Sequence, residues 1–517
     1  MKTTSLIFLI LFLSLGLITL AAQETETNES TPEEVVDEGA EDEAEEEEKE
    51  KTIEELTENS DLIEGLFTFY RDRKTGEVRL LLSEDDLDKE YLYFSYAENG
   101  PPESGWLTRG SYITYNAKLF VIRRFFDHIE FIEENTSFYF NPDKAISRAA
   151  NANVSHSIFF EKKIESENEE TGQILIKVDG LFLSESFIPI APLPNPEKKP
   201  HEVFSMGDLS KDKSKIRTIK NYPENTDVRV EYVFENKKPY ISGSSALTDP
   251  RFISVVIQHS LIAVPAEPMQ PRFDDPRVGY FGQEVTDLSS TEAVPYRDMI
   301  KRWRLKKKDP DAALSEPVEP IVYWIENTTP VELRPIIEKA ALTWNEAFEQ
   351  AGFKNALQIK IQPDDAAWDA GDIRYNVLRW VSSPRPQYGG YGPSFLDPRS
   401  GEILGADVML EHSVISRQIR EGQTLGDPSL DAYHFQHNPE VCTAAFHAKN
   451  EFQFANFALE ALGATTEENQ RLLEEFIYFL TLHEIGHTLG LSHNFKSSYL
   501  HSLDDIYDPD KTYSKGL

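Results

Sequence analysis

The sequence contains one cysteine among its 517 residues. A single thiol cannot form an intramolecular disulfide, and a cysteine-rich zinc module needs several thiols, so both are excluded. Basic residues are also scarce, because 52 Lys and Arg stand against 89 Asp and Glu, for a formal net charge of −37. The average surface of such a protein repels the phosphate backbone of a nucleic acid. We therefore expect no nucleic-acid partner.

Long hydrophobic runs are absent except over residues 6–20. Lys2 precedes this run and Ala21-Ala22 follow it, which is the pattern of a secretory signal peptide. The run is short for a membrane span, which needs about 20 residues; an uncleaved membrane anchor is the alternative. We expect a signal peptide over residues 1–22 and a mature protein without a transmembrane segment. Such a protein is exported, to the periplasm or to the extracellular medium.

Residues 23–60 carry 18 acidic side chains and two basic ones. Like charges along the chain repel one another, and the segment has little apolar surface to bury. We therefore predict an acidic, disordered linker over residues 23–60. A calcium-buffering or inhibitory tail is the alternative interpretation of the same charges.

Hydrophobic residues make up 40% of the sequence and aromatic residues 11%, which is enough for folded cores. From residue 61 onward, short apolar runs alternate with turn residues, and the two runs around Gly76 predict a β-hairpin. Regularly spaced short strands are typical of sandwich-like or barrel-like packing. We predict a small β-rich domain over residues 61–105 and a second β-rich domain over residues 106–285. Whether this half presents substrate, assists folding or is a plain scaffold stays open.

The pattern changes after residue 285, where residues 286–315 lack periodicity and are predicted to be a connector. Strands then alternate with long helices. Thr329-Pro330-Val331-Glu332 has the pattern of a capping box that begins a helix, and residues 402–411 are predicted to form a strand. The predicted fold class is multidomain, with a β-rich N-terminal half followed by an α/β (α+β) domain over residues 316–517.

A metal-binding pattern occurs near the C-terminal end of the sequence. His483 and His487 are four residues apart, so on a helix both imidazoles project from one face and can hold one Zn²⁺. Gly490 allows the chain to stop the helix and turn, which can bring His493 back as a third ligand. Glu484 lies one helical step away and can act beside the metal. Three imidazoles leave a fourth position for water, as in catalytic zinc sites.

This pattern is specific. Histidine accounts for only 12 of the 517 residues, and these five residues at fixed offsets should arise by chance in roughly 3 of 100,000 such chains. The alternative is a pair of helix-face histidines packed in a core. We therefore take His483, His487 and His493 as predicted metal ligands and Glu484 as the predicted catalytic residue.

The spacing His-Glu-x-x-His-x-x-Gly-x-x-His resembles the motif of the metzincin zinc endopeptidases. The wider stretch, with Asn494-Phe495-Lys496 after the third histidine, resembles exported bacterial Met-zincin proteins. Those proteins have two β-rich domains of unknown function before the catalytic domain, and residues 272–281 resemble the junction between the two parts. The resemblance implies a metzincin-like zinc-peptidase domain with one catalytic Zn²⁺ and a protein or peptide substrate.

The same resemblance implies a substrate-binding strand. Residues 401–410 resemble the metzincin edge strand above the active-site cleft. Such a strand pairs with an extended substrate through backbone hydrogen bonds. We therefore expect Gly405, Ala406 and Val408 to contact the substrate, with an ordinary edge strand as the alternative.

One feature of metzincins is missing from the sequence. They place a methionine-containing turn beneath the zinc, some distance after the third histidine. Only 24 residues follow His493, and all five methionines precede it. They are Met1, Met206, Met269, Met299 and Met409. We therefore expect the catalytic domain to be incomplete at its C-terminus, ending before the Met-turn.

The predicted function is that of an exported zinc-dependent endopeptidase. Zinc-bound water would attack the peptide carbonyl, with Glu484 as the general base. Two alternatives remain. One is a catalytically silent metzincin-like module that binds peptides or surfaces, and the other is a zinc hydrolase of a non-peptide substrate.

Overall fold

The structure is a computed structural model that describes residues 51–511 apart from eleven gaps. The gaps are residues 106, 114–116, 192–196, 276, 384–387, 413–450, 453, 456, 460, 464 and 495–498. The signal peptide predicted over residues 1–22 therefore lies outside the described residues, as does most of the acidic linker. Residues from 50 onward form one compact unit.

The end of the predicted linker is folded. Residues Ile53–Thr57 form helix α1, and strand β1 (Ser60–Ile63) begins directly after it. The Thr52 hydroxyl accepts from the N–H of Glu55, whose carboxylate accepts from the N–H of Thr52, and Ile53 is buried. A capping box and one anchoring apolar residue thus order the segment, so the prediction of disorder up to residue 60 is wrong for its last residues.

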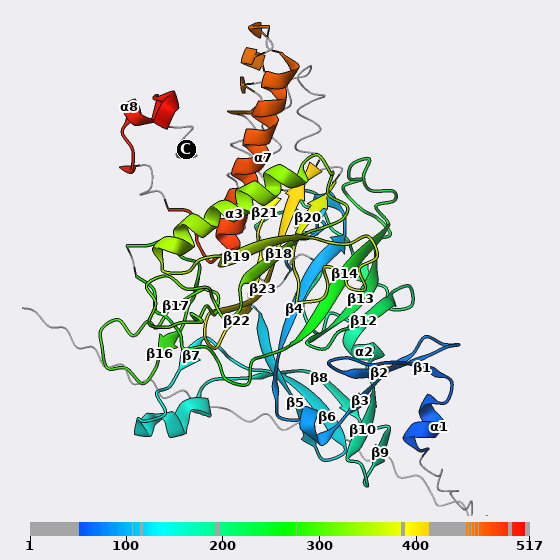
Figure 1. The fold of residues 1–517 in the computed structure, drawn as a ribbon. Coiled ribbons are helices and arrows are strands. Elements are labelled where there is room, and N and C mark those ends of the chain that lie inside the picture. Colours follow the sequence, from blue (N-terminus) through cyan, green and yellow to red (C-terminus); the bar gives the residue numbers. More distant parts are fainter. Residues whose placement is uncertain are drawn as a thin grey trace, which may run out of the picture. The chain divides into compact units, whose positions relative to one another are not determined.

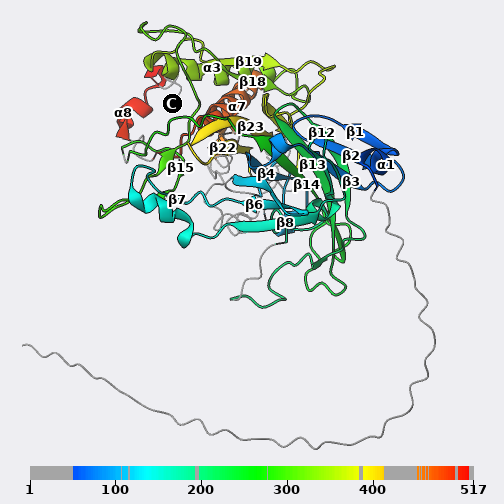
Figure 2. The same ribbon diagram turned by 90° about the horizontal axis from the view of Figure 1, so that it is seen from below.

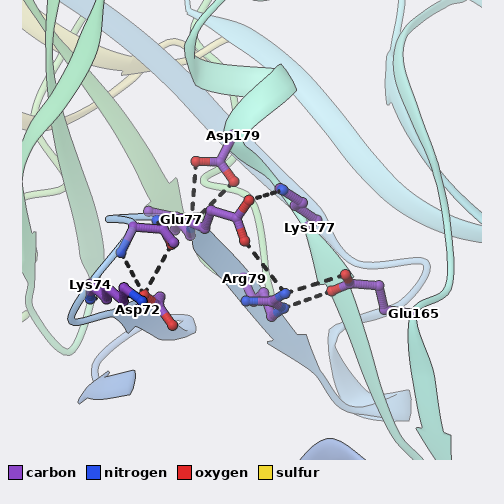
Figure 3. A network of polar contacts seen from close by, with 9 residues as sticks. Asp72, Lys74, Glu77, Arg79, Glu165, Lys177 and Asp179 are labelled. Carbon is purple, nitrogen blue, oxygen red and sulfur yellow. Dashed lines mark hydrogen bonds and ion pairs between the residues drawn. The ribbon is translucent and has the colours of Figure 1, made fainter. Parts of the chain in front are cut away.

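The first sheet has five strands in the order β1-β2-β3-β10-β9. Strands β2 (Thr68–Asp72) and β3 (Val78–Leu82) form the hairpin predicted around Gly76, which has φ +77°. The other strands are β9 (Ser166–Asn168) and β10 (Gln173–Lys177). Figure 3 shows charged side chains that link these strands: Arg79 lies between Glu77 and Glu165, 2.8 Å from the Glu165 carboxylate, and Lys177 contacts Glu77.

The second sheet has eight strands in the order β11-β13-β14-β4-β5-β6-β8, with β12 paired to β13. Their bounds are β4 (Glu90–Asn99), β5 (Lys118–Phe125), β6 (His128–Glu133), β8 (Ser157–Lys163), β11 (Asp208–Leu209), β12 (Lys215–Asn221), β13 (Asn225–Glu235) and β14 (Phe252–Ala263). One hydrophobic core contains residues of this sheet and of the five-stranded sheet, including Phe69, Leu80, Tyr93, Phe120 and Val230. This sharing of a core is sandwich-like packing.

The second sheet continues across the boundary predicted at residue 105. Strand β4 is buried along most of its length and pairs with β14 on one side and with β5 on the other. A boundary at residue 105 would cut the ladder between β4 and β5. The predicted domains 61–105 and 106–285 therefore share one sheet in the structure, because a long apolar strand needs a neighbour on each side.

Short elements connect the larger parts. Helix α2 (Asp179–Phe182) follows β10, and β7 (Phe138–Tyr139) pairs with β16 (Thr286–Asp287). Strand β15 (Gly282–Gln283) pairs with β17 (Met299–Ile300). Three 3₁₀ helices span Glu84–Asp86, Pro102–Ser104 and Ala145–Ala152, and helix α8 spans Leu503–Ile506. No helix within the described ranges is long and apolar enough to cross a membrane.

The C-terminal region has a six-stranded sheet in the order β19-β18-β20-β23-β21, with β22 also paired to β23. The elements are β18 (Ile321–Ile325), α3 (Arg334–Gln350), β19 (Leu357–Ile361), β20 (Asn376–Val381), β21 (Gly390–Tyr391), β22 (Ser394–Asp397), β23 (Glu402–Glu411) and α7 (Thr466–Thr488). Strands β19, β18, β20 and β23 run parallel, whereas β21 and β22 run antiparallel to β23. The region thus combines strands with two long helices, and among the described residues β19 to β23 follow one another between α3 and α7.

Helices α3 and α7 pack together on the sheet, as Figure 1 shows. Ile337 of α3 and Leu480 of α7 share a core with Tyr323, Leu378 and Val408 of the strands. In both views, α3 and α7 lie at the opposite end of the described region from β6 and β8 (Figures 1 and 2). The β-rich half contacts the sheet through a separate core, in which Phe94 packs edge-on against Phe395 of β22.

Helix α3 begins later than predicted. Its N-cap is Leu333, without a side-chain hydrogen bond, and the helix starts at Arg334. The Thr329 carbonyl instead accepts from the Arg334 side chain, and the N–H of Leu333 bonds to the Pro330 carbonyl in a turn. The capping box predicted over residues 329–332 is therefore wrong, because this segment forms a turn that precedes the helix.

Candidate metal centre

Helix α7 places two of the predicted ligands on one face. Thr465 and Glu468 form a capping box at its start, as the sequence Thr-x-x-Glu favours. The helix then runs 23 residues, to Thr488. His483 and His487 are one turn apart near its end, with ring centroids 4.7 Å from each other. The helix therefore presents both imidazoles at the point where the chain leaves the core.

The third histidine returns to the same place. One ring nitrogen from each of His483, His487 and His493 lies within 4.8 Å of the others. The Nε2 atoms of His483 and His493 are 3.1 Å apart. Two nitrogens that bind zinc tetrahedrally at about 2.0–2.1 Å are separated by about 3.3 Å. The three imidazoles are therefore spaced as ligands of one zinc ion would be.

The tautomer of His487 suits a metal ligand. Its Nδ1 is 2.8 Å from the carbonyl oxygen of Leu491, which can only accept, so Nδ1 carries the proton. The Nε2 atom is buried and makes no hydrogen bond to the described residues. A hydrogen bond from the other ring nitrogen to a backbone carbonyl orients the imidazole of a metal-binding histidine. Nε2 of His487 thus holds a lone pair that only a ligand can satisfy.

Burial favours the neutral form of His483 and His487. Burial lowers the pKa of His483 to about 4, and the nearby His487 and His493 add to the effect. Burial also lowers the pKa of His487, against the opposing effect of its bond to Leu491. Only the neutral imidazole has a lone pair for a metal. Both side chains are therefore ready to bind a cation at neutral pH.

Glu484 is buried beside the histidines, at 0% exposure. Neither carboxylate oxygen makes a well-formed hydrogen bond to the described residues. Burial raises the pKa of Glu484 to about 8, against a smaller opposing effect of the Gly392 N–H. A buried carboxyl without a firm partner is costly to retain. The orphaned oxygens and the orphaned His487 nitrogen together fit a site built for zinc and a reacting water.

Two glycines of the β21 region bring the chain against Glu484. A Cβ on Gly390 would lie 2.6 Å from the Glu484 side chain, and one on Gly392 would lie 2.3 Å from the Glu484 carbonyl oxygen. The sequence analysis did not identify these residues. Their only signal is the run Gly389-Gly390-Tyr391-Gly392-Pro393, since closely spaced glycines permit close backbone approach.

The predicted substrate strand has a different position. Strand β23 pairs with β20 at Val408 and with β22 at Gly405 and Ala406, and all three residues are buried. Both of its sides are occupied, so the expectation that Gly405, Ala406 and Val408 form an edge is wrong. The terminal strand on the β23 side of the sheet is β21. It pairs with β23, and no further strand among the described residues pairs with it.

Two parts of the chain match known families. Residues 465–517, which contain the histidine motif, match a family described as Met-zincin. Residues 116–308 match a domain of unknown function, DUF5117. Neither a curated protein nor a solved structure matches the chain. The Met-zincin match and the three clustered histidines point to a zinc metallopeptidase-like site.

Proposed function

We propose that this protein is a zinc-dependent endopeptidase in which His483, His487 and His493 bind the metal and Glu484 is the general base. The observation that carries the proposal is the convergence of the three imidazoles within 4.8 Å, next to a buried carboxyl. The Met-zincin match over residues 465–517 supports the same class of chemistry.

The roles follow from the positions of the side chains. A catalytic zinc ion polarises a carbonyl group and lowers the pKa of water. Glu484 is outside the group of three ligands. The positive charge of a zinc ion held beside it would favour the ionised carboxylate, which could then take a proton from the attacking water. The same carboxyl can then return the proton to the leaving amine. Burial of Glu484 keeps bulk water from competing for that proton.

A polypeptide substrate fits the end of the sheet. Strand β21 is the terminal strand and passes directly against Glu484 through Gly390 and Gly392. An extended peptide can add to such an edge by backbone hydrogen bonds. Its scissile bond would then lie beside the carboxyl and the histidines. We also propose, from residues 1–22 of the sequence alone, that the protein is exported.

The test is digestion of casein by the full chain purified with zinc. Glu484→Gln should retain zinc and lose about 10²–10⁴-fold in turnover, because the amide cannot take a proton. Glu475→Gln on the same helix is the control, since Glu475 is exposed and forms an i,i+4 ion pair with Arg471. Wild-type turnover by Glu484→Gln would show that Glu484 is not the base.

A further inference from the structure

The turn that carries His493 is held by a distant part of the chain. Two segments, residues 279–281 and 301–303, lie against it; we refer to them together as the clasp. Both segments fall within the match to the domain of unknown function over residues 116–308. The contacts between the clasp and the turn are made largely by backbone atoms.

Local hydrogen bonds close the turn only as far as Leu491. The N–H of Gly490 donates to His487 and that of Leu491 to Gly486, at 2.9 and 3.1 Å. The next N–H, of Ser492, donates instead to the carbonyl of Gly279 at 3.2 Å. The chain therefore passes from helix-end bonding to bonding with the clasp one residue before His493.

The first clasp segment pairs with the turn like a short strand. The N–H of Phe281 donates to the Gly490 carbonyl at 2.8 Å, and Tyr280 forms an antiparallel bridge with Leu491. Together with the Ser492 bond, these contacts fix three successive residues before the third histidine. An antiparallel ladder of this kind sets the direction in which the chain leaves the turn.

The second clasp segment contacts both the first segment and Gly490 of the turn. The N–H of Lys301 donates to the Phe281 carbonyl at 2.8 Å. Gly490 has φ +94°, and a Cβ there would lie 2.0 Å from the carbonyl oxygen of Lys301. Gly490 is thus required both for its left-handed backbone and because the clasp leaves no room for a side chain.

Two clasp side chains reach helix α7 itself. The indole N–H of Trp303 donates to the carbonyl of Thr488, the last residue of the helix, at 2.9 Å. A terminal carbonyl that the helix cannot satisfy is thereby bonded. The ring of Phe281 packs against the ring of His487, with centroids 5.4 Å apart. The clasp therefore contacts the second ligand as well as the turn to the third.

We infer that Gly279, Phe281 and Trp303 are positioning residues of the metal centre, so that the region before α7 is a working part of that centre. This inference rests on the proposed function. It gives the end of the segment matched over residues 116–308 a specific role, which is to hold His493 in the geometry that completes the proposed ligand set. Residues that orient metal ligands typically change metal affinity 10- to 100-fold when they are replaced.

The test uses two valine variants of the full chain. A Cβ on Gly279 would lie 2.9 Å from the Ser492 hydroxyl oxygen, 3.5 Å from the His493 carbonyl oxygen and 3.6 Å from the Asn494 Cβ. The larger side chain of Gly279→Val should therefore crowd the turn at three successive residues. A Cβ on Gly282 would find its nearest neighbour, the Met299 carbonyl oxygen, at 3.5 Å, which is an ordinary contact. Gly282→Val is therefore the matched control. Phe281→Leu is a milder second variant that removes the ring next to His487.

The readouts are cobalt affinity, measured by competition with a chelator, and the visible absorption of the bound Co²⁺. We expect wild type and Gly282→Val to bind one Co²⁺ with the intense absorption of tetrahedral coordination. Gly279→Val and Phe281→Leu should bind about 10- to 100-fold more weakly, with altered absorption. The thermal unfolding midpoint of the metal-free protein checks folding. If Gly279→Val does not fold, the Co²⁺ affinity and absorption of Phe281→Leu test the inference on their own.

The outcomes separate the two proposals. If both variants bind Co²⁺ with the affinity and absorption of wild type, the inference is overturned while the proposed function stands. If wild type itself binds no Co²⁺ or Zn²⁺, the proposed function fails, and the inference fails with it.

Discussion

The carbonyl oxygen of Leu491 accepts a hydrogen bond from Nδ1 of His487 at 2.8 Å. This single bond joins the last turn of α7 to the loop that carries His493. It fixes the tautomer of His487 and leaves Nε2, which is buried, as the atom that can bind a metal. The loop that delivers the third ligand therefore also orients the second.

Removal of the third ligand should abolish tight metal binding without unfolding the protein. His493 is exposed, so His493→Ala creates no cavity, but it leaves only two imidazoles for the metal. We expect zinc content after dialysis to fall from one per chain to near zero. The thermal unfolding midpoint of the metal-free protein should stay unchanged. His156→Ala, another exposed histidine, should keep its zinc; equal zinc content in both variants would contradict the assignment.

A side chain on Gly392 should disturb the base. A Cβ there would lie 2.3 Å from the Glu484 carbonyl oxygen, which is backbone and cannot move aside cheaply. We expect Gly392→Ala to cost about 1–3 kcal/mol in unfolding free energy and to reduce casein turnover. The control is Gly180→Ala, where the nearest atom, on Phe160, is 3.6 Å away. Urea unfolding compares the two variants, and equal stability would argue against close contact between β21 and α7.

The buried His259 should make the β-rich half sensitive to acid. Its ring nitrogens contact the hydroxyls of Tyr93 and Tyr232 at 2.9 and 2.7 Å, and burial lowers the pKa of His259 from 6.5 to about 3. Below pH 6.5 the unfolded chain takes up a proton that the folded chain refuses. The contribution of His259 to the free energy of unfolding is therefore fully present above pH 6.5, and it is lost as the pH falls toward 3.

The loss from His259 is up to about 1.4 kcal/mol for each pH unit in that window. Urea unfolding of wild type and of His259→Gln at pH 7 and pH 5 measures it. Glutamine keeps a donor and an acceptor but does not titrate. Wild type should therefore lose more stability than the variant between these values. Equal losses would show that His259 does not control this transition.

Zinc removal should inactivate the protein reversibly. Dialysis against a chelator should remove the ion that we propose the three imidazoles hold, and casein turnover should then fall to background. Added Zn²⁺ should restore it, because the clasp and the capping box of α7 are formed by the chain and not by the metal. Full turnover by the zinc-free protein would contradict a metal-dependent mechanism.

Local patterns explain most of what the sequence predicts correctly. His483 and His487 lie four apart on one helix, and the capping box at Thr465 marks its start, so both features can be read from nearby residues. Strand β23 was predicted with its observed bounds because apolar residues occupy most of its interior positions and a glutamate stands at each end. Its neighbours could not be predicted, since pairing depends on residues far away in the chain. The edge was therefore assigned to β23 instead of β21.

The clasp could not be predicted for the same reason. Nothing in residues 279–281 or 301–303 indicates a metal centre, because their contacts, most of them backbone hydrogen bonds, are with a turn about 200 residues later. Gly490 was predicted from its need for a left-handed backbone, whereas its lack of space beside Lys301 depends on tertiary contact. Likewise, nothing in the sequence of β4 indicates that both of its neighbours, β5 and β14, lie beyond residue 105.

The most direct test of the metal centre is zinc-edge X-ray absorption of the full chain, together with the zinc content per chain. We expect one zinc per chain, coordinated by three imidazole nitrogens at about 2.0–2.1 Å. If His493→Ala retains any zinc, that zinc should have one imidazole ligand fewer. The proposed metal centre would be contradicted if wild type contains no zinc. It would also be contradicted if the zinc in His493→Ala has the same coordination shell as in wild type.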